Sequence, residues 1–216
     1  MSGGSSEAHE ELLNVYDATG AVVGTRPRAE AKGAGLAVGA VNILLVNARR
    51  EVLLQRRPRD KENGGRWDKS VGGHVSAGED FDDTARRECG EELFDDPRSA
   101  PVVLVPTPAL AAECARRDLG RHVVFAPLAR QLNLRDVRAG ADGALRNVTY
   151  HVGIYAGRTD VPIGGFRPQP SEIDELAYFS AGALDLLLLR GELAPNMAFL
   201  WLAHGHAVLG LVPPRA

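Results

Sequence analysis

The chain has 216 residues, of which 44% are hydrophobic and 25% charged, close to the averages for globular domains. A net charge of −3 gives no reason to expect a nucleic-acid or membrane partner, and two cysteines exclude a disulfide framework. The polar residues 1–10 are expected to be a flexible leader, because they lack the apolar core of a signal peptide. Residues 11–214 are expected to form a single cytoplasmic domain, with monomer and homodimer both open.

The first half of the chain begins with strand patterns. Leu12–Tyr16 and Ala21–Val23 flank an Asp-Ala-Thr-Gly sequence, which predicts a hairpin. Ala40–Val46 and Glu51–Gln55 predict a second pair of strands. The polar, glycine-containing residues 56–69 then predict a loop.

A glycine-rich loop is expected over Ser70–Gly78, followed by a helix over Asp80–Leu93 that Pro97 prevents from continuing. The second half is expected to hold a helix, two strands and two further helices: Thr107–Asp118, Val123–Phe125, Val148–Ile154, Ser180–Arg190, and a helix from Pro195 that stops before Gly210. Strands first, then a helix, then mixed elements predict an α+β fold or an α/β/α sandwich.

Three glutamates lie on one side of the predicted helix 80–93. At about 100° per residue, Glu88, Glu91 and Glu92 fall within an arc of roughly 100°. Like charges at these spacings destabilise a helix by about 0.2–0.5 kcal/mol per pair, and the nearby helix C-terminus also disfavours them. Arg87 can pair with Glu91 but cannot neutralise all three. A hard cation such as Mg²⁺ or Mn²⁺ would do so, and a solvated acidic face is the alternative.

The wider spacing resembles a known motif. Gly73, five residues, Glu79, seven residues, Arg87-Glu88, two residues and Glu91-Glu92 is similar to the Nudix box. The resemblance implies a single Nudix domain, an α/β/α sandwich around a mixed sheet. One stretch departs from it, because the box ends with a glycine and an apolar residue where this chain has Phe94 and Asp95.

The residues around the box resemble one branch of the family in particular. Leu53–Arg57, Lys61, Trp67 and Ser70–His74 look like the branch that includes isopentenyl-diphosphate isomerases. Those isomerases carry a catalytic cysteine where this chain has Gly72, so the resemblance favours hydrolysis over isomerisation. Compared with the family, the connection over residues about 95–146 is long, and this insertion is expected to influence substrate choice.

By resemblance, the metal ligands would be Glu88, Glu91 and Glu92, with the carbonyl of Gly73 as a further candidate. The full catalytic set that the resemblance implies is Glu79, Arg87, Glu88, Glu91 and Glu92. Arg87 would hold Glu79 or a neighbouring glutamate, and the metal would activate a water for attack on phosphorus. Members of the family differ in the general base, which here would be a helix glutamate or a later one, Glu172 or Glu175.

Residues expected to bind the substrate are mostly cations, which suit phosphate oxygens. They are Arg56, Arg57, Lys61, Lys69, His74 and Glu172. For each of them an ordinary surface or structural role is the alternative. The expected function is metal-dependent cleavage of a diphosphate linkage in a nucleoside diphosphate derivative or a related organic diphosphate. An isomerase-like enzyme and a non-catalytic nucleotide-binding module are the other possibilities.

Overall fold

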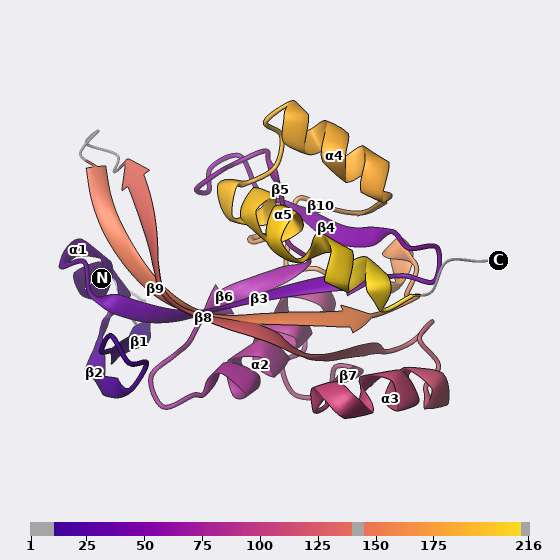
Figure 1. Cartoon of the computed structure of the whole chain (residues 1–216), viewed down its shortest axis with the longest axis horizontal. Coiled ribbons are helices and arrows are strands. Elements are labelled where there is room, and N and C mark those ends of the chain that lie inside the picture. The colour runs from indigo at the N-terminus through magenta and orange to yellow at the C-terminus, as the bar shows by residue number, and fades with distance from the viewer. Residues whose placement is uncertain (1–10, 140–144, 213–216) are drawn as a thin grey trace, which may run out of the picture.

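A computed structural model describes residues 11–139 and 145–212. Figure 1 shows a central sheet with helix α2 (Phe81–Phe94) on one side and helices α4 (Ala181–Leu189) and α5 (Pro195–Gly210) on the other. The remaining helical elements are α1 (Arg28–Gly33), α3 (Leu110–Arg116) and the 3₁₀ turns Thr107–Ala109 and Ile163–Gly165. The layers confirm the α+β sandwich that the sequence predicts. No helix within the described ranges is long and apolar enough to cross a membrane.

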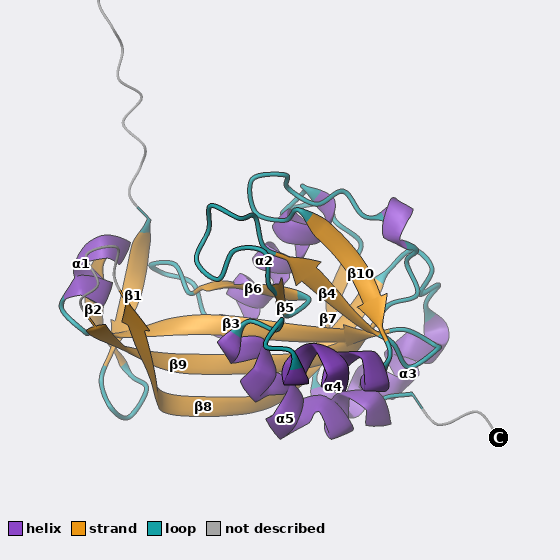
Figure 2. Ribbon diagram, turned by 90° about the horizontal axis from the view of Figure 1, so that it is seen from above, coloured by secondary structure: helices purple, strands orange, loops and turns teal. Residues whose placement is uncertain are grey.

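The sheet is mixed and strongly curled. Within the described ranges its strands are β1 (Leu12–Tyr16), β2 (Val22–Pro27), β3 (Ala37–Val46), β4 (Val52–Arg56), β5 (Trp67–Asp68), β6 (Val71–His74), β7 (Val102–Leu104), β8 (Val123–Ala139), β9 (Leu145–Arg158) and β10 (Glu175–Phe179). The main order is β10-β4-β3-β9-β8-β7, in which β3 and β9 are parallel and β4 is antiparallel to both its neighbours. The β1–β2 hairpin and α1 lie at the opposite end of the sheet from α3 (Figure 2).

One edge of β3 is shared by two strands, and this division positions the candidate site. Leu45 and Val46 pair with β4, whereas residues 40–43 pair with β6, because the end of β4 turns away from β3 and pairs with β5. Ser70 fills the point of divergence. Its Oγ accepts from the N–H of Leu45 (2.9 Å) and donates to the carbonyl of Leu53 (2.6 Å). The backbone groups that the divergence would leave unpaired are thereby satisfied, and β4 and β6 form a fork.

Helix α2 lies on the face of the sheet next to this fork. The Asp80 side chain caps it by accepting from the N–H of Asp83 at 2.8 Å. Its apolar side chains recur every fourth residue and are buried against β3, β9 and neighbouring elements: Phe81, Ala85, Cys89 and Leu93. The helix ends at Phe94, and the residue that caps it, Asp95, adopts a left-handed conformation with φ 52°. The exit residue is therefore one position after Phe94, which occupies the place of the family's glycine.

The opposite face is covered by α4 and α5. Ser180 caps α4, as predicted, by accepting from the N–H of Ala183 at 3.3 Å. Leu184 from α4 and Met197 from α5 are fully buried in the core beneath the two helices. Burial of each such side chain stabilises the fold by about 1.5–3 kcal/mol. Gly210 is the last residue of α5 rather than the C-cap that the sequence predicted.

Several elements differ from the sequence-based expectations. Ser70–Gly78 was expected to be loop, yet residues 71–74 form β6, because β3 supplies hydrogen-bond partners to a segment whose glycines have low strand propensity. Helix α1 and strand β5 were not expected. The expected strand Val123–Phe125 is the start of β8, which pairs with β9 along most of its length. The segment 95–146, as far as the structure describes it, thus contributes two strands to the same sheet.

Helix α2 contains Gly90, for which the sequence offers no reason. A Cβ there would lie 2.6 Å from the carbonyl oxygen of Asp96 and 3.1 Å from Cα of Pro97, both backbone atoms. Helix propensity alone favours Gly90→Ala by about 1 kcal/mol, but the clash outweighs it.

We expect Gly90→Ala to lower the free energy of unfolding by about 1–3 kcal/mol in thermal melts. Gly182→Ala in α4, where the new Cβ would have no heavy atom within 4 Å apart from its own helix backbone and chain neighbours, is the control and should be neutral or stabilising. A Gly90→Ala protein as stable as the wild type would contradict this close approach.

Candidate active site

Arg87 of α2 organises one half of the candidate site. Its Nε donates to Oε1 of Glu79 (2.8 Å) and its Nη2 to Oε2 of the same carboxylate (3.1 Å). Its Nη1 lies 3.0 Å from Glu88 and 2.9 Å from Glu91. One guanidinium therefore contacts three carboxylates, more than the single Glu91 pair expected from helix spacing. Burial alone would raise the pKa of Glu79, but hydrogen bonds from Arg87 and Thr84 hold it below its usual value.

Glu92 is the glutamate of the motif that Arg87 does not contact. It is buried, and its Oε2 accepts from Nε2 of Gln55 and from the N–H of Gly72, both at 3.1 Å. Burial, followed by the charge of Glu88, raises the pKa of Glu92 to about 8. Helix α2 therefore holds this carboxyl directly against β4 and β6, the two arms of the fork.

Glu88 lies against the same strand one residue further along. A Cβ at Gly73 would lie 1.9 Å from Oε1 of Glu88, so only a glycine leaves room for this carboxylate. Burial is the main cause that raises the pKa of Glu88 to about 7, and the charge of Glu91 adds to it. Buried Glu92 and largely buried Glu88 are thus two carboxyls one helical turn apart, which is costly unless a cation accompanies them.

A buried oxygen beside Glu92 shows that these residues suit a divalent cation. Oε1 of Gln55 is buried and has no hydrogen-bond partner, while Nε2 of the same amide is committed to Glu92. Carboxylate and amide oxygens are ligands that Mg²⁺ and Mn²⁺ accept. The residues that could hold such an ion are Glu88, Glu92 and Gln55, with Glu91 as a further carboxylate. Across the described ranges no group of three acidic, histidine or cysteine side chains is arranged to hold a metal ion, and Arg87 pairs with both Glu88 and Glu91.

Two of the predicted substrate-binding cations meet at the fork. Asp68 of β5, paired with Gln55 of β4, lies 3.6 Å from Nη1 of Arg57 and 3.4 Å from Nζ of Lys69. Lys61 instead donates to Glu172 at 2.8 Å. His74 ends β6 beyond Gly73, and its ring centroid lies 6.1 Å from that of Tyr150. The structure therefore brings Arg57 and Lys69 together and ties Lys61 to Glu172.

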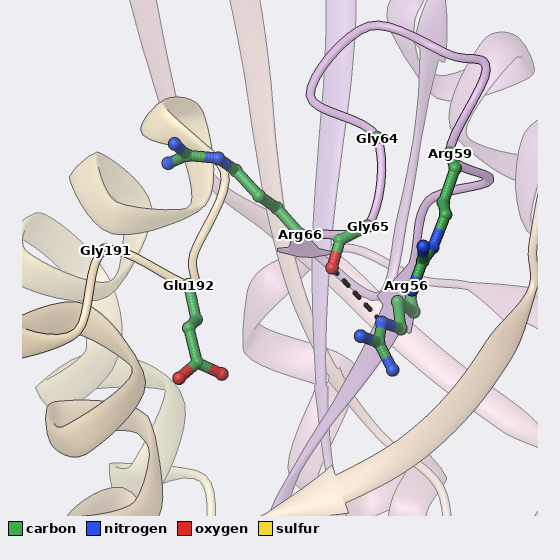
Figure 3. A pocket seen from close by; sticks show the side chains of 7 residues that line it. All are labelled: Arg56, Arg59, Gly64, Gly65, Arg66, Gly191 and Glu192. Atoms are coloured by element: carbon green, nitrogen blue, oxygen red, sulfur yellow. Dashed lines mark hydrogen bonds between the residues drawn. The ribbon is translucent and has the colours of Figure 1, made fainter.

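Arg56 lies apart from the glutamates. Neighbouring residues of a strand point to opposite faces, so Arg56 and Gln55 lie on opposite faces of β4. The Arg56 guanidinium is 5.8 Å from the centroid of the Trp67 ring, donates to the carbonyl of Gly65 (3.1 Å) and pairs with Glu175 (3.5 Å). Figure 3 shows it beside Arg59 and opposite Glu192, in an open cavity of about 520 Å³. The structure does not bring Arg56 to the carboxylates of α2.

Sequence reasoning missed three residues of this site. Gln55, Asp68 and Thr84 are buried polar residues that contact the predicted set. A signal for Gln55 was present, because it is a polar residue at the end of an otherwise apolar strand. The sequence around Asp68 and Thr84 gave no signal that either residue belongs to the site.

The buried carboxyls predict how the stability of the metal-free protein depends on pH. The pKa values of Glu88 and Glu92 rise from an ordinary 4.5 to about 7 and about 8 in the folded state. The folded protein then binds more protons than the unfolded chain over this range. Stability is fully present below the unfolded pKa and is lost as pH rises through the folded values. In EDTA we expect the melting temperature to fall between about pH 5 and pH 9, with a smaller fall in Glu92→Gln. Equal pH dependence in the two proteins would contradict the burial of Glu92.

Comparisons with known proteins agree with the fold and the motif. A Nudix hydrolase of Pseudomonas aeruginosa is 42% identical over 84 residues, which are 38% of this chain and 50% of that protein. One from Streptomyces coelicolor is 37% identical over 94 residues, 43% of this chain and 51% of that protein. The chain thus spans about half the length of these curated relatives.

A crystal structure of a Deinococcus radiodurans protein shows the same fold, with a TM-score of 0.61 at 22% identity. The alignment covers 88% of this chain and 96% of that protein. The model of the NUDIX domain matches residues 36–199, which include the fork and helix α2. The chain therefore belongs to the Nudix family.

Proposed function

We propose that this chain hydrolyses a diphosphate linkage in a nucleoside diphosphate derivative or a related organic diphosphate, with Mg²⁺ or Mn²⁺ as cofactor. The observation that carries the proposal is the pair of carboxyls, buried Glu92 and largely buried Glu88, beside the unpartnered oxygen of Gln55. Two carboxylates with little exposure to water, next to an unused oxygen ligand, suit a divalent cation. The relatives named as Nudix hydrolases support the reaction class.

The roles of the residues follow from their contacts. Glu88, Glu91 and Glu92 would hold the ion, with Gln55 and the carbonyl of Gly73 as further oxygen ligands. Bound Mg²⁺ or Mn²⁺ would supply positive charge to the phosphoryl oxygens and acidify a water. Arg87 positions Glu88 and Glu91 and fixes them to the Glu79 carboxylate. Arg57 and Lys69, which share Asp68, would bind phosphate oxygens on the β4 side.

The general base has two possible origins. Glu172 and Glu175 are each held by a cation, at 2.8 Å from Lys61 and 3.5 Å from Arg56, whereas the helix glutamates lie at the proposed ion site. The contacts favour a helix glutamate. On this assignment Glu172→Gln should change kcat by less than about tenfold, whereas a base in the later loop would cost on the order of 10²- to 10⁴-fold.

The competing functions make different use of the same residues. Isomerisation of isopentenyl diphosphate is disfavoured, because Gly72 supplies no thiol. A non-catalytic nucleotide-binding module would not need three motif glutamates and a partly buried arginine, all of which this chain keeps.

A panel of diphosphate compounds tests the proposal. The purified protein is incubated with nucleotide sugars, dinucleoside polyphosphates, nucleoside triphosphates and isopentenyl diphosphate, with Mg²⁺ or Mn²⁺ and with excess EDTA. We expect ³¹P NMR to show cleavage of at least one diphosphate in the presence of metal and none in EDTA. Conversion of isopentenyl diphosphate to its isomer, turnover that survives thorough chelation, or tight nucleotide binding without any cleavage would each contradict the proposal.

A further inference from the structure

The side chain of Lys69 lies directly over Gly72. A Cβ at residue 72 would lie 1.9 Å from Cε of Lys69 and 3.0 Å from its Nζ. The Lys69 side chain is only 9% exposed, so it passes through the protein interior to reach this position. Any residue other than glycine at position 72 would therefore displace the end of the lysine.

The position of Gly72 places the lysine at the proposed ion site. The N–H of Gly72 donates to Oε2 of Glu92, so the strand residue beneath the lysine also holds this carboxylate. Gly73, the next residue, is the one against which Glu88 lies. Two successive glycines thus leave room for two different functional side chains. The cation of Lys69 lies over Gly72, and the carboxylate of Glu88 lies against Gly73.

The Lys69 ammonium has unused hydrogen-bonding capacity. It carries three donors, and its Nζ lies 3.4 Å from both oxygens of Asp68, longer than the roughly 2.7–2.9 Å of a strong charge-assisted bond. Within residues 11–139 and 145–212, the structure shows no hydrogen bond of this Nζ other than these two. Because Asp68 also pairs with Arg57, its single negative charge is shared by two cations. A nearly buried ammonium with a shared counter-ion is suited to a further anionic oxygen.

We propose that Gly72 and Lys69 act as a pair. Because Gly72 has no side chain, the Lys69 ammonium can lie beside Glu92, and there it binds a phosphoryl oxygen of the substrate. The inference rests on the proposed function and adds a determinant of specificity to it. The site would select ligands that place an anionic phosphoryl oxygen next to the ion. A side chain at residue 72 would remove this contact without removing any carboxylate of α2.

A double-mutant cycle on the full chain tests the pair. Gly72→Ala, Lys69→Ala and the double variant are compared by calorimetry with methylenediphosphonate, a non-hydrolysable diphosphate, in saturating Mg²⁺. Each single change should weaken binding by roughly ten- to hundredfold, because a hydrogen bond to a charged group is lost. The double variant should be no weaker than Lys69→Ala, since nothing remains for the new methyl group to displace. Gly182→Ala is the matched glycine control and should bind normally.

A second readout separates this inference from the proposed function. The protein is treated with an amine-reactive reagent in EDTA, and acylation of Lys69 is measured by mass spectrometry. The extent of acylation reports how accessible the Lys69 ammonium is without metal or substrate. Lys69 should be protected in the wild type and reactive in Gly72→Ala. Normal diphosphonate binding by Lys69→Ala, or a Gly72→Ala defect that persists in full on the Lys69→Ala background, would overturn the pair. Should Gly72→Ala fail to fold, Lys69→Met binding as tightly as wild type would overturn it as well. A protected Lys69 in a wild-type protein that neither binds diphosphonate nor cleaves any diphosphate would contradict the proposed function and, with it, the phosphoryl contact.

Discussion

Glu92→Gln is expected to lower kcat/KM by about three orders of magnitude and to make the metal-free protein more stable. Activity falls because the variant loses a charged ligand for the proposed ion and the stabilisation of the transition state that depends on it. Stability rises because burial raises the pKa of Glu92 to about 8, which means that the folded state tolerates the charged form poorly. A neutral amide keeps the shape and can still accept from Gly72 and Gln55.

The two effects are measured on the same preparations. Rates are determined at saturating Mg²⁺ with the best substrate of the panel, and melting temperatures are determined in EDTA at about pH 8.5. Each kcal/mol gained should raise the melting temperature by about 2–4 °C in a chain of this size. Glu30→Gln is the control, because Glu30 is exposed on α1 and, among the described residues, forms its ion pair with Arg26 alone. Near-wild-type activity of the Glu92→Gln protein would show that Glu92 is not needed for catalysis.

Arg87→Ala is expected to lower stability and activity together, in contrast to Glu92→Gln. The guanidinium contacts Glu79, Glu88 and Glu91, so its removal leaves three partly buried carboxylates without their cation. Removing one partner of a buried ion pair costs about 3–5 kcal/mol, and the 25% exposure of Arg87 reduces the expected loss to about 2–4 kcal/mol. Activity should fall at least about a hundredfold, because the two metal-ligand candidates lose their positioning.

The adjacent arginine provides a matched control. Arg86 is 49% exposed, and its one ion pair within the part of the chain that the structure describes is with Asp83, at 3.1 Å. Arg86→Ala should change stability by less than about 1 kcal/mol and leave kcat/KM near that of the wild type. Equal losses in Arg86→Ala and Arg87→Ala would mean that the network around Glu79 has no special role.

Local periodicity was enough to predict the helix and its carboxylates. Residues three and four apart share a helix face, so Glu88, Glu91, Glu92 and Arg87 could be placed together without knowledge of the fold. The helix start at Asp80 was predictable for similar reasons, because these features depend on contacts between residues that are near one another in the chain. The two-sided cover of the sheet was expected instead from the order of the elements and from the resemblance to the Nudix family.

The other half of the site could not be predicted, because the β4/β6 fork creates it. Gln55 meets Glu92 across 37 positions of sequence, and this contact requires β4 and α2 to pack together. The register of β4 decides whether Arg56 or Arg57 lies on the same side as the glutamates, because a shift of one residue moves every side chain of a strand to the opposite face of the sheet. The glycines of β6 have low strand propensity, so their role as seats for Lys69 and Glu88 becomes visible only with the tertiary structure.

Binding of Mn²⁺ to the purified protein, followed by the EPR signal of the free ion, tests the central claim most directly, because it requires no substrate. We expect a saturable site in the wild type, and at least about tenfold weaker binding in Glu88→Gln and in Glu92→Gln. Glu30→Gln should bind Mn²⁺ like the wild type. Equal affinity in all four proteins would show that the carboxylates of α2 hold no metal, and would contradict the account.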